Sequence, residues 1–321
     1  MALRLTLIFA AFAAAAGAAA AAGVGEWVYE GRWNGSSGGA GQLNDPRGAD
    51  VGPNGYVYVT DYENNRIQYF TQTGDYRGTW GVTGSSDGQF HRPLGIAISP
   101  GGYVYVSDAG NFRVQYFTLA GSFVGKWGTE GLGAGQFTNV RYLSFAADGT
   151  VYVTDADRVQ RFTAAGSYVG AWGVYGFGNG EFRAAYGVGV RSDGNVYVVD
   201  DNNNRVQYFT AAGAYLGQWG SYNNEPGDFQ FPEGLDAAPN GDIYVADTVS
   251  KRVQYFTATG SLLGTFGDFT GPGSLSRPHD VALTPDGRRV FIPDISYVKY
   301  YRWVEADVAP ASLGKIKTLF H

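Results

Sequence analysis

Cysteine is absent from this 321-residue sequence, which excludes disulfides, thiolate metal sites and cysteine nucleophiles. Charged residues are scarce at 16%, and 23 Lys+Arg against 29 Asp+Glu give a net charge of −6, which argues against a nucleic-acid partner. Beyond residue 22, no apolar run is long enough to cross a membrane. The sequence is instead rich in glycine, with 49 residues, and in aromatic side chains, at 16%. This pairing indicates a globular chain with many turns.

Residues 1–22 have the composition of a secretory signal peptide. A basic start that contains Arg4 leads into the apolar stretch 5–22, whose second half is nearly all alanine and ends in small residues suited to cleavage. An uncleaved anchor is the alternative, because about 18 apolar residues are near the lower limit for a membrane span. Cleavage would remove one arginine and shift the net charge from −6 to −7. Together with the lack of cysteine, the segment predicts a secreted or periplasmic protein from a prokaryote.

One block of the sequence recurs six times. It is clearest from Gly88 and returns, at spacings of 45 to 47 residues, from Gly41, Gly135, Gly180, Gly227 and Gly273. A repeat of about 40–50 residues with four short strands is the signature of a β-propeller. We therefore expect an all-β fold, a six-bladed β-propeller of four-stranded blades.

Each copy divides into strands and turns. In the second copy, alternating apolar residues predict strands over 95–99, 103–107, 113–118 and 122–127, separated by Gly-rich or polar turns. The abundant glycine is thereby explained by turns and by close contacts between blades. Helical periodicity is missing from the repeats.

A Trp-Gly pair ends the fourth strand of most copies and gives a second count. It appears first at Trp33, ahead of the first full copy, and has no successor after the last copy, which ends near Trp303 with three strands. We expect the strand at 27–33 to complete the last blade and close the ring, which removes exposed sheet edges. This predicts one propeller domain over 23–304 and a tail, 305–321, whose apolar spacing is compatible with a short helix.

The repeated pattern of Pro-x-Gly, Val-Tyr-Val-x-Asp, Asn-x-Arg-Val-Gln-Tyr-Phe and a terminal Trp-Gly resembles the NHL-repeat family. The resemblance covers about residues 24–303. It implies a six-bladed propeller, but it leaves the function open, because that family includes enzymes, RNA binders, sensors and scaffolds.

An Asp and a basic residue recur at the turn between the second and third strands of every copy. A residue type present in every blade is typical of a structural role, here an Asp that accepts backbone N–H bonds and pairs with the cation. The pairs are Asp61–Arg66, Asp108–Arg113, Asp155–Arg158, Asp200–Arg205, Asp247–Arg252 and Asp294–Lys299. Function is expected instead where the copies differ.

The copies differ at the two positions that start the first strand, around the mouth of the central channel. Four blades have glycine at the second position, but blades three and six carry Tyr142 and Asp280, and these blades lie opposite each other in a six-membered ring. Drift or local repacking is the alternative interpretation. Inside the first strands, Asp50 and Asp236 are candidates for binding channel water or a cation. The candidate ligand-binding residues of the mouth, suited to a small polar or acidic ligand, are Arg47, Arg141, Tyr142, Tyr186, Glu233, His279 and Asp280.

The resemblance also brings two metal-dependent enzyme classes into consideration. Peptide-amidating lyases of this kind bind zinc through three histidines in the channel, and the segment Arg277-Pro278-His279-Asp280 is similar to one of their ligand segments. The whole sequence has three histidines, one of them the terminal His321, so a three-His site is not available. A mixed site of His279, Glu233 and Asp280 stays open. For the calcium site of lactonase-type propellers, Glu233 alone fits.

These observations favour an exported, monomeric binding or scaffold module, without catalytic residues, cofactor or metal, for a protein, peptide or glycan on its upper, channel-mouth face. The alternative is a channel-site enzyme, a metal-assisted lyase or hydrolase that uses His279 with nearby acidic groups. Aromatic and amide side chains of the upper loops offer stacking and hydrogen bonds to a ligand. They are Tyr62, Asn64, Phe112, Asn202, Asn203, Asn204, Tyr222, Asn223, Asn224 and Tyr297.

Overall fold

The computed structural model describes residues 25–33, 39–268 and 270–305, so the predicted signal peptide and the predicted tail helix lie outside the described residues. The chain divides into two compact units. One unit is Tyr29–Arg302. The other joins Met1–Val28 with Trp303–His321, and within it the rings of Trp27 and Trp303 meet edge-to-face at 5.5 Å. In the described part of the chain, no helix has the length and apolar character that a membrane span needs.

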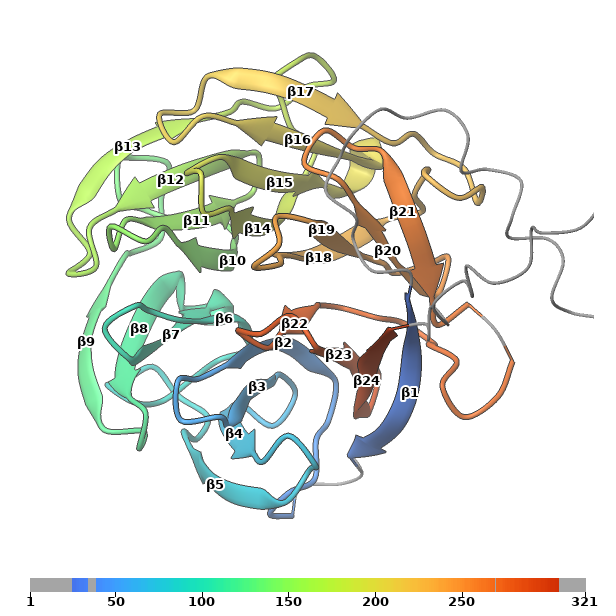
Figure 1. The fold of residues 1–321 in the computed structure, drawn as a ribbon. Coiled ribbons are helices and arrows are strands. Elements are labelled where there is room, and N and C mark those ends of the chain that lie inside the picture. Colours follow the sequence, from blue (N-terminus) through green and yellow to red (C-terminus); the bar gives the residue numbers. More distant parts are fainter. Residues whose placement is uncertain (1–24, 34–38, 269, 306–321) are drawn as a thin grey trace, which may run out of the picture. The chain divides into compact units, whose positions relative to one another are not determined.

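Six four-stranded antiparallel sheets, the blades, follow one another around a ring (Figure 1). Blade one contains β2 (Pro46–Val51), β3 (Val57–Asp61), β4 (Arg66–Phe70) and β5 (Tyr76–Trp80). Blade two contains β6 (Pro93–Ile98), β7 (Tyr103–Asp108), β8 (Arg113–Thr118) and β9 (Phe123–Trp127). Blade three contains β10 (Val140–Phe145), β11 (Val151–Asp155), β12 (Arg158–Phe162) and β13 (Tyr168–Trp172).

The remaining blades repeat this arrangement. Blade four contains β14 (Ala185–Val190), β15 (Val196–Asp200), β16 (Arg205–Phe209) and β17 (Tyr215–Trp219). Blade five contains β18 (Pro232–Ala237), β19 (Ile243–Asp247), β20 (Arg252–Phe256) and β21 (Leu262–Phe266). Blade six contains β22 (Ala282–Leu283), β23 (Arg289–Asp294), β24 (Tyr297–Glu305) and β1 (Gly25–Trp33). Among the described residues, the helices are two short 3-10 turns, η1 (Ala109–Asn111) and η2 (Asp201–Asn203).

The strands of blade two test the sequence prediction in detail. The third strand, 113–118, is confirmed at both ends, and the second and fourth strands differ by one residue. The first strand begins two residues earlier than predicted, because Pro93 pairs with Asp108 before a bulge shifts the register at Ile96. The alternation of side chains therefore predicts where a strand lies, whereas a bulge at its end hides its start.

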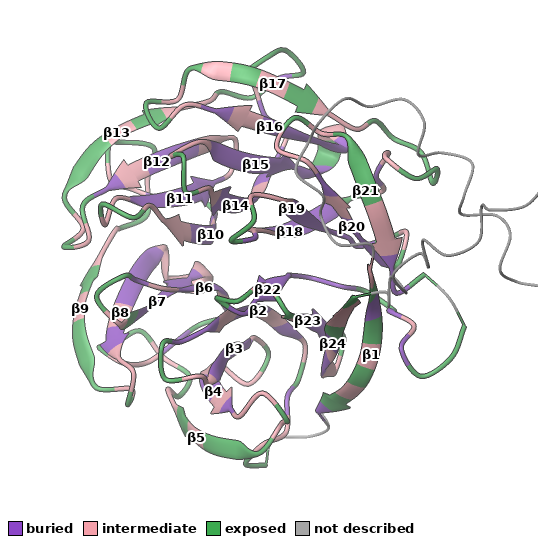
Figure 2. Cartoon of the chain, in the orientation of Figure 1, coloured by how far each residue is buried: buried purple, intermediate pink, exposed green. Residues whose placement is uncertain are grey.

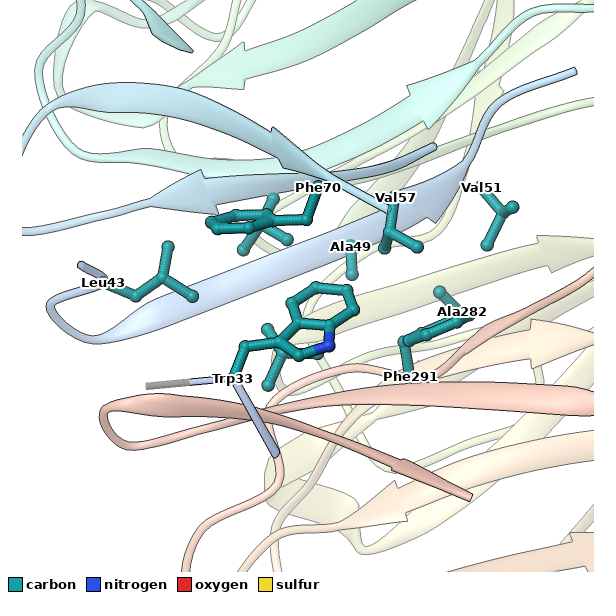
Figure 3. Packing of buried hydrophobic residues seen from close by; sticks show 10 residues of the cluster. Trp33, Leu43, Ala49, Val51, Val57, Phe70, Ala282 and Phe291 are labelled. Atoms are coloured by element: carbon teal, nitrogen blue, oxygen red, sulfur yellow. The ribbon is translucent and has the colours of Figure 1, made fainter. Parts of the chain in front are cut away.

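The last blade combines strands from both ends of the propeller. Its strand order is β1-β24-β23-β22, so the N-terminal strand takes the outermost position, as predicted. The indole ring of Trp33 packs between two blades, 5.1 Å from Phe70 of blade one and 5.4 Å from Phe291 of blade six (Figure 3). Leu43 and Ala282 belong to the same buried cluster. Apolar packing thus closes the ring without a covalent link.

The recurring Asp has the structural role that the repeats predict. In blade two, the buried Asp108 carboxylate accepts bonds from the His91 backbone N–H and from Arg113 Nε, each at 2.7 Å. Arg113 also donates to the carbonyl oxygen of Gln89, in the loop that enters the blade. A buried carboxylate needs such partners to offset the loss of water. The pair therefore joins the upper turn of each blade to the loop before it.

Burial decreases from the inner strands to the outer strands (Figure 2). All five residues of β3 are buried, while β9 exposes residues on its outer side. Glycine at the lower turns allows the next blade to approach closely: at Gly121, which has a φ of +86°, a Cβ atom would lie 2.7 Å from the Trp80 ring. The positive φ of the turn and the close contact with the neighbouring blade therefore both require glycine at this position.

Candidate functional site

The channel-mouth face is made of the loops that connect successive blades and of the turns between second and third strands. Every described non-glycine residue with a positive φ lies in these segments. A left-handed backbone costs an ordinary residue roughly 1–2 kcal/mol, so backbone strain is concentrated on this face. The residues are Asp45, Asn65, Arg92, Phe112, Ala156, Ala184, Asn204, Phe231, Lys251 and Ile295.

Tyr142 of blade three crosses the channel beneath the mouth. Its hydroxyl lies 3.1 Å from the carbonyl oxygen of His279 and 3.2 Å from that of Arg47, and its one proton is shared between these two acceptors. The side chain is buried and fills space that the glycines of four other blades leave open. Through Tyr142, blade three therefore contacts blades six and one. The two blades that carry Tyr142 and Asp280 in place of glycine do face each other across the channel.

Four charged side chains from blades one, five and six form a paired cluster at the mouth. His279 is fully buried, with Nδ1 2.8 Å from Glu233 Oε2 and Nε2 3.4 Å from Asp45 Oδ1. Arg47 donates to Asp45 at 2.7 Å and lies 3.5 Å from Glu233. Burial works to lower the pKa of His279, but the contacts with Asp45 and Glu233 outweigh it, and the pKa is raised. Opposite charges therefore pair within the cluster, although His279 Nε2 makes no hydrogen bond in the described part of the chain.

Three carboxyl groups line a cavity of about 60 Å³ inside the channel, those of Asp50, Asp236 and Asp280. Asp50 accepts backbone N–H bonds from Val51 and from Ile98 of the next blade, each at 2.6 Å. Asp236 likewise accepts from its own blade and, at 2.9 Å, from blade six. These carboxyl groups therefore tie neighbouring inner strands together, a role that the sequence did not indicate.

Burial changes the protonation of this acidic group. Burial, with Asp236 nearby, raises the pKa of Asp50 to about 7, and burial raises that of Asp236 to about 6. Burial also raises the pKa of Asp280 well above its usual range. The channel interior therefore favours protonated carboxyl groups at mildly acidic pH.

Arg141 and Tyr186 occupy the side of the mouth formed by blades three and four. The guanidinium carbon of Arg141 lies 4.1 Å from the centre of the Tyr186 ring, and its Nη1 donates to the carbonyl oxygen of Ala185 at 3.1 Å. The rings of Tyr186 and Tyr142 are 6.4 Å apart. Of the seven residues predicted for the mouth, the structure thus places three in the paired cluster, two in the channel and two on this side.

The residues predicted from the sequence did not include two acidic residues of the mouth, Asp45 and Asp201. Asp45 precedes the first strand of blade one, and Asp201 follows the strand-two Asp of blade four. Burial, with Glu233 nearby, raises the pKa of Asp201 to about 7. Both stand at positions where the six copies disagree, so extending the comparison of copies by a few residues would have found them.

The mixed metal site of His279, Glu233 and Asp280 is not formed. His279 and Glu233 are in contact, but the Asp280 carboxylate lies in the channel and accepts a bond from the Ala49 N–H at 3.2 Å. Within the described residues, no three His, Cys, Asp or Glu side chains converge as ligands of a metal ion. Catalytic zinc normally takes three protein ligands, so the side chains of the channel do not fit that group.

Exposed aromatic side chains gather on two neighbouring loops of the channel-mouth face, 173–184 and 220–231. Tyr175 and Phe177 of the first loop are each 66% exposed, and Tyr222 of the second is 65% exposed. Phe231, at 41%, packs edge-to-face against Tyr222 at 6.2 Å. We call these four residues the aromatic surface.

The turn of blade four, 202–204, connects the two loops. Asn203 donates to the carbonyl oxygen of Gly176 at 2.9 Å, and the side-chain oxygen of Asn204 accepts from the Phe231 N–H at 2.8 Å. Of the upper-loop residues that the sequence suggests for contact with a ligand, Tyr222 is exposed, whereas Asn204 is buried and Phe112 is half-buried. Asn204 is buried because its amide serves this connection rather than a ligand.

Comparison with known proteins agrees with the propeller architecture. The family model of the NHL repeat matches residues 43–70, 90–117 and 229–256. The matched segments fall on blades one, two and five, so NHL repeats build these three blades of the six-bladed β-propeller. No curated protein matches the chain.

Solved structures extend this likeness to the whole fold. A streptogramin B lyase is 15% identical with a TM-score of 0.61, and the match covers 87% of this chain and 98% of that one. A gluconolactonase from Xanthomonas campestris is 14% identical with a TM-score of 0.62, covering 88% and 98%. Virginiamycin B lyase from Staphylococcus aureus is 14% identical with a TM-score of 0.55, covering 80% of each chain. At these identities the similarity concerns the fold alone.

Proposed function

We propose that the chain is a non-catalytic binding module whose channel-mouth face docks a protein or peptide. The aromatic surface carries this proposal, because three of its rings are about two-thirds exposed, whereas every other exposed aromatic ring of the described chain is at most 42% exposed. Val174, at 64% exposed, and Leu132, at 80%, add aliphatic side chains on the same set of loops. Grouped exposed apolar side chains mark interaction sites, and aromatic residues supply much of the binding energy at interfaces.

A glycan is the second ligand class that suits this face. Aromatic rings can stack on sugar rings, and Asn202 and Asn223 could bond to hydroxyl groups. Phenylalanine, valine and leucine, however, offer no hydrogen bonds, and they favour a partner with apolar side chains of its own.

The enzyme alternative has weaker support. His279 would have to present a ring nitrogen to a substrate or a metal, yet the side chain is fully buried and both nitrogens face carboxylates. The similarity to lyases and to a gluconolactonase is a similarity of fold.

The same proposal includes export of a monomer. Residues 1–22 would be a cleaved signal peptide, 23–304 the propeller and 305–321 a tail, with the mature chain in the periplasm or outside a prokaryotic cell. Sequencing the N-terminus of the chain recovered from its native compartment tests this. A start near residue 23 supports export, and an intact Met1 contradicts cleavage.

Site-specific crosslinking tests the docking surface. A photo-reactive amino acid would replace Phe177 or Tyr222 in the full chain, expressed in the cells that produce it, and Tyr103 would serve as the control. Tyr103 is 40% exposed and begins β7, at the opposite face of the blades. The proposal predicts one protein adduct from both upper positions and none from position 103. Adducts from all three positions, or from position 103 alone, would refute it, and a carbohydrate adduct would shift the assignment to a glycan.

A further inference from the structure

Arg141 is a cation that forms no salt bridge within the described residues, and its charge acts at longer range on the carboxyl groups of Asp157 and Asp201. No carboxylate of the described chain lies within 4.0 Å of its guanidinium, in contrast to Arg47 on the other side of the mouth. Its one side-chain hydrogen bond within the described residues goes from Nη1 to the Ala185 carbonyl, and its flat face rests on the Tyr186 ring. The remaining N–H groups of the guanidinium are therefore free to bind an anion.

Asp201 is an acid without a partner. The residue is nine-tenths buried, and its Oδ1 has no hydrogen-bond partner in the described part of the chain. A buried carboxyl oxygen that is left without a donor costs roughly 1–3 kcal/mol. Such an atom points to a donor outside the chain, either an ordered water molecule or a group of a ligand.

One short segment at the start of β14 brings these two groups together. The Asp201 backbone N–H donates to the carbonyl oxygen of Ala184 at 3.0 Å, while Arg141 donates to the carbonyl oxygen of the following residue, Ala185. Tyr186, next in the chain, supports the guanidinium. Ala184 itself has a strained φ of +137°, so the segment is held in an unfavourable conformation at the point where both groups attach.

From this arrangement we propose that the mouth between blades three and four binds a small zwitterion of the amino-acid class. The ligand carboxylate would accept from Arg141 and from the Tyr186 hydroxyl. The ligand ammonium would donate to Asp201. This site shares no side chain with the aromatic surface and does not depend on the docking proposal.

The electrostatics around Tyr186 agree with this assignment. Burial raises the pKa of the Tyr186 hydroxyl, and Arg141 and Glu233 are the next strongest influences on it. The paired cluster already neutralises Arg47 and His279. Arg141 and Asp201 are therefore two groups of opposite sign on this side of the mouth that no salt bridge pairs, and a ligand with one group of each sign matches both.

Isothermal calorimetry on the full chain tests the site with the twenty L-amino acids as probes. At least one of them should bind, while acetate and methylamine, which each carry one of the two charges, should bind at least tenfold more weakly. The substitutions Arg141→Met and Asp201→Asn should each weaken binding by about tenfold or more, because each removes a charge-assisted hydrogen bond. Arg183→Met, which removes a different arginine of the same face, should leave the affinity unchanged.

Each other outcome overturns the proposal. Absence of binding by all twenty amino acids would do so, as would equal binding of acetate or methylamine. An affinity that survives both Arg141→Met and Asp201→Asn would place any binding elsewhere. Asp201→Asn keeps the size of the side chain, so a folded variant is expected even if Arg141→Met loses stability, and circular dichroism checks both.

Discussion

The hydroxyl of Tyr142 donates across the channel to the carbonyl oxygen of His279, 3.1 Å away, and thereby connects blades that are opposite each other in the ring. Tyr142→Phe keeps the ring and removes the hydroxyl. It should lower the free energy of unfolding by about 1–3 kcal/mol, because buried carbonyl oxygens lose their donor. Urea unfolding measures this. The matched control is Tyr222→Phe, at an exposed position, which should change little, and equal effects of the two variants would contradict the account.

Ring closure depends on the N-terminal strand. Deleting residues 25–33 removes the outermost strand of blade six together with the Trp33 side chain, so we expect a large drop in Tm or loss of folding. Trp33→Ala alone should cost about 3–5 kcal/mol, as for other buried aromatic residues. Glu26→Ala, at an exposed position of the same strand, is the control. A deletion variant that melts at the original temperature would disprove closure by this strand.

The Asp-to-Arg pairs predict that breaking a buried ion pair costs much more stability than breaking an exposed one. Asp108→Ala leaves Arg113 buried and unpaired, and should cost about 3–5 kcal/mol. Asp87→Ala breaks the exposed pair with Lys126 and should cost about 0–1 kcal/mol. Denaturant titration of both variants measures the difference. Similar losses would show that the recurring Asp does not hold the blade turn.

The channel carboxyl groups predict that the protein is more stable at pH 5 than at pH 8. Burial raises the pKa of Asp50 to about 7 and that of Asp236 to about 6, so the folded chain binds these protons more tightly than the unfolded chain. Stability therefore falls as pH rises from about 4 through the folded pKa values. The raised pKa of His279 acts in the same direction, because its stabilisation is lost as pH rises through that pKa.

Thermal melts across this pH range provide the measurement. Asp50→Asn removes one titrating group and should reduce the difference in Tm between pH 5 and pH 8. Asp148→Asn is the control, since this carboxyl is exposed and its pKa is lowered by hydrogen bonds to Thr150. A Tm that rises from pH 5 to pH 8 would be inconsistent with protonated carboxyl groups in the channel.

The repeats predicted the fold almost completely, because strand alternation, turn glycines and the Trp-Gly count all describe one unit six times over. They also predicted that the blades carrying Tyr142 and Asp280 lie opposite each other. They could not predict that Tyr142 would span the channel or that Asp45 would hold His279, because both depend on side-chain reach across blades. Asp201 stands at a position where the copies disagree, but the lack of a hydrogen-bond partner for its Oδ1 is visible only when all neighbours are placed.

The central claim is that the channel-mouth face binds a partner through the aromatic surface. The most direct test uses the partner that crosslinking identifies, once it has been purified. Its affinity is measured for the full chain and for the double variant Phe177→Ala, Tyr222→Ala. Tyr103→Ala is the control. The account predicts that the double variant binds at least about tenfold more weakly, because aromatic residues dominate interface energies. It also predicts that the control binds as the original chain does. Equal affinity of all three proteins would contradict it.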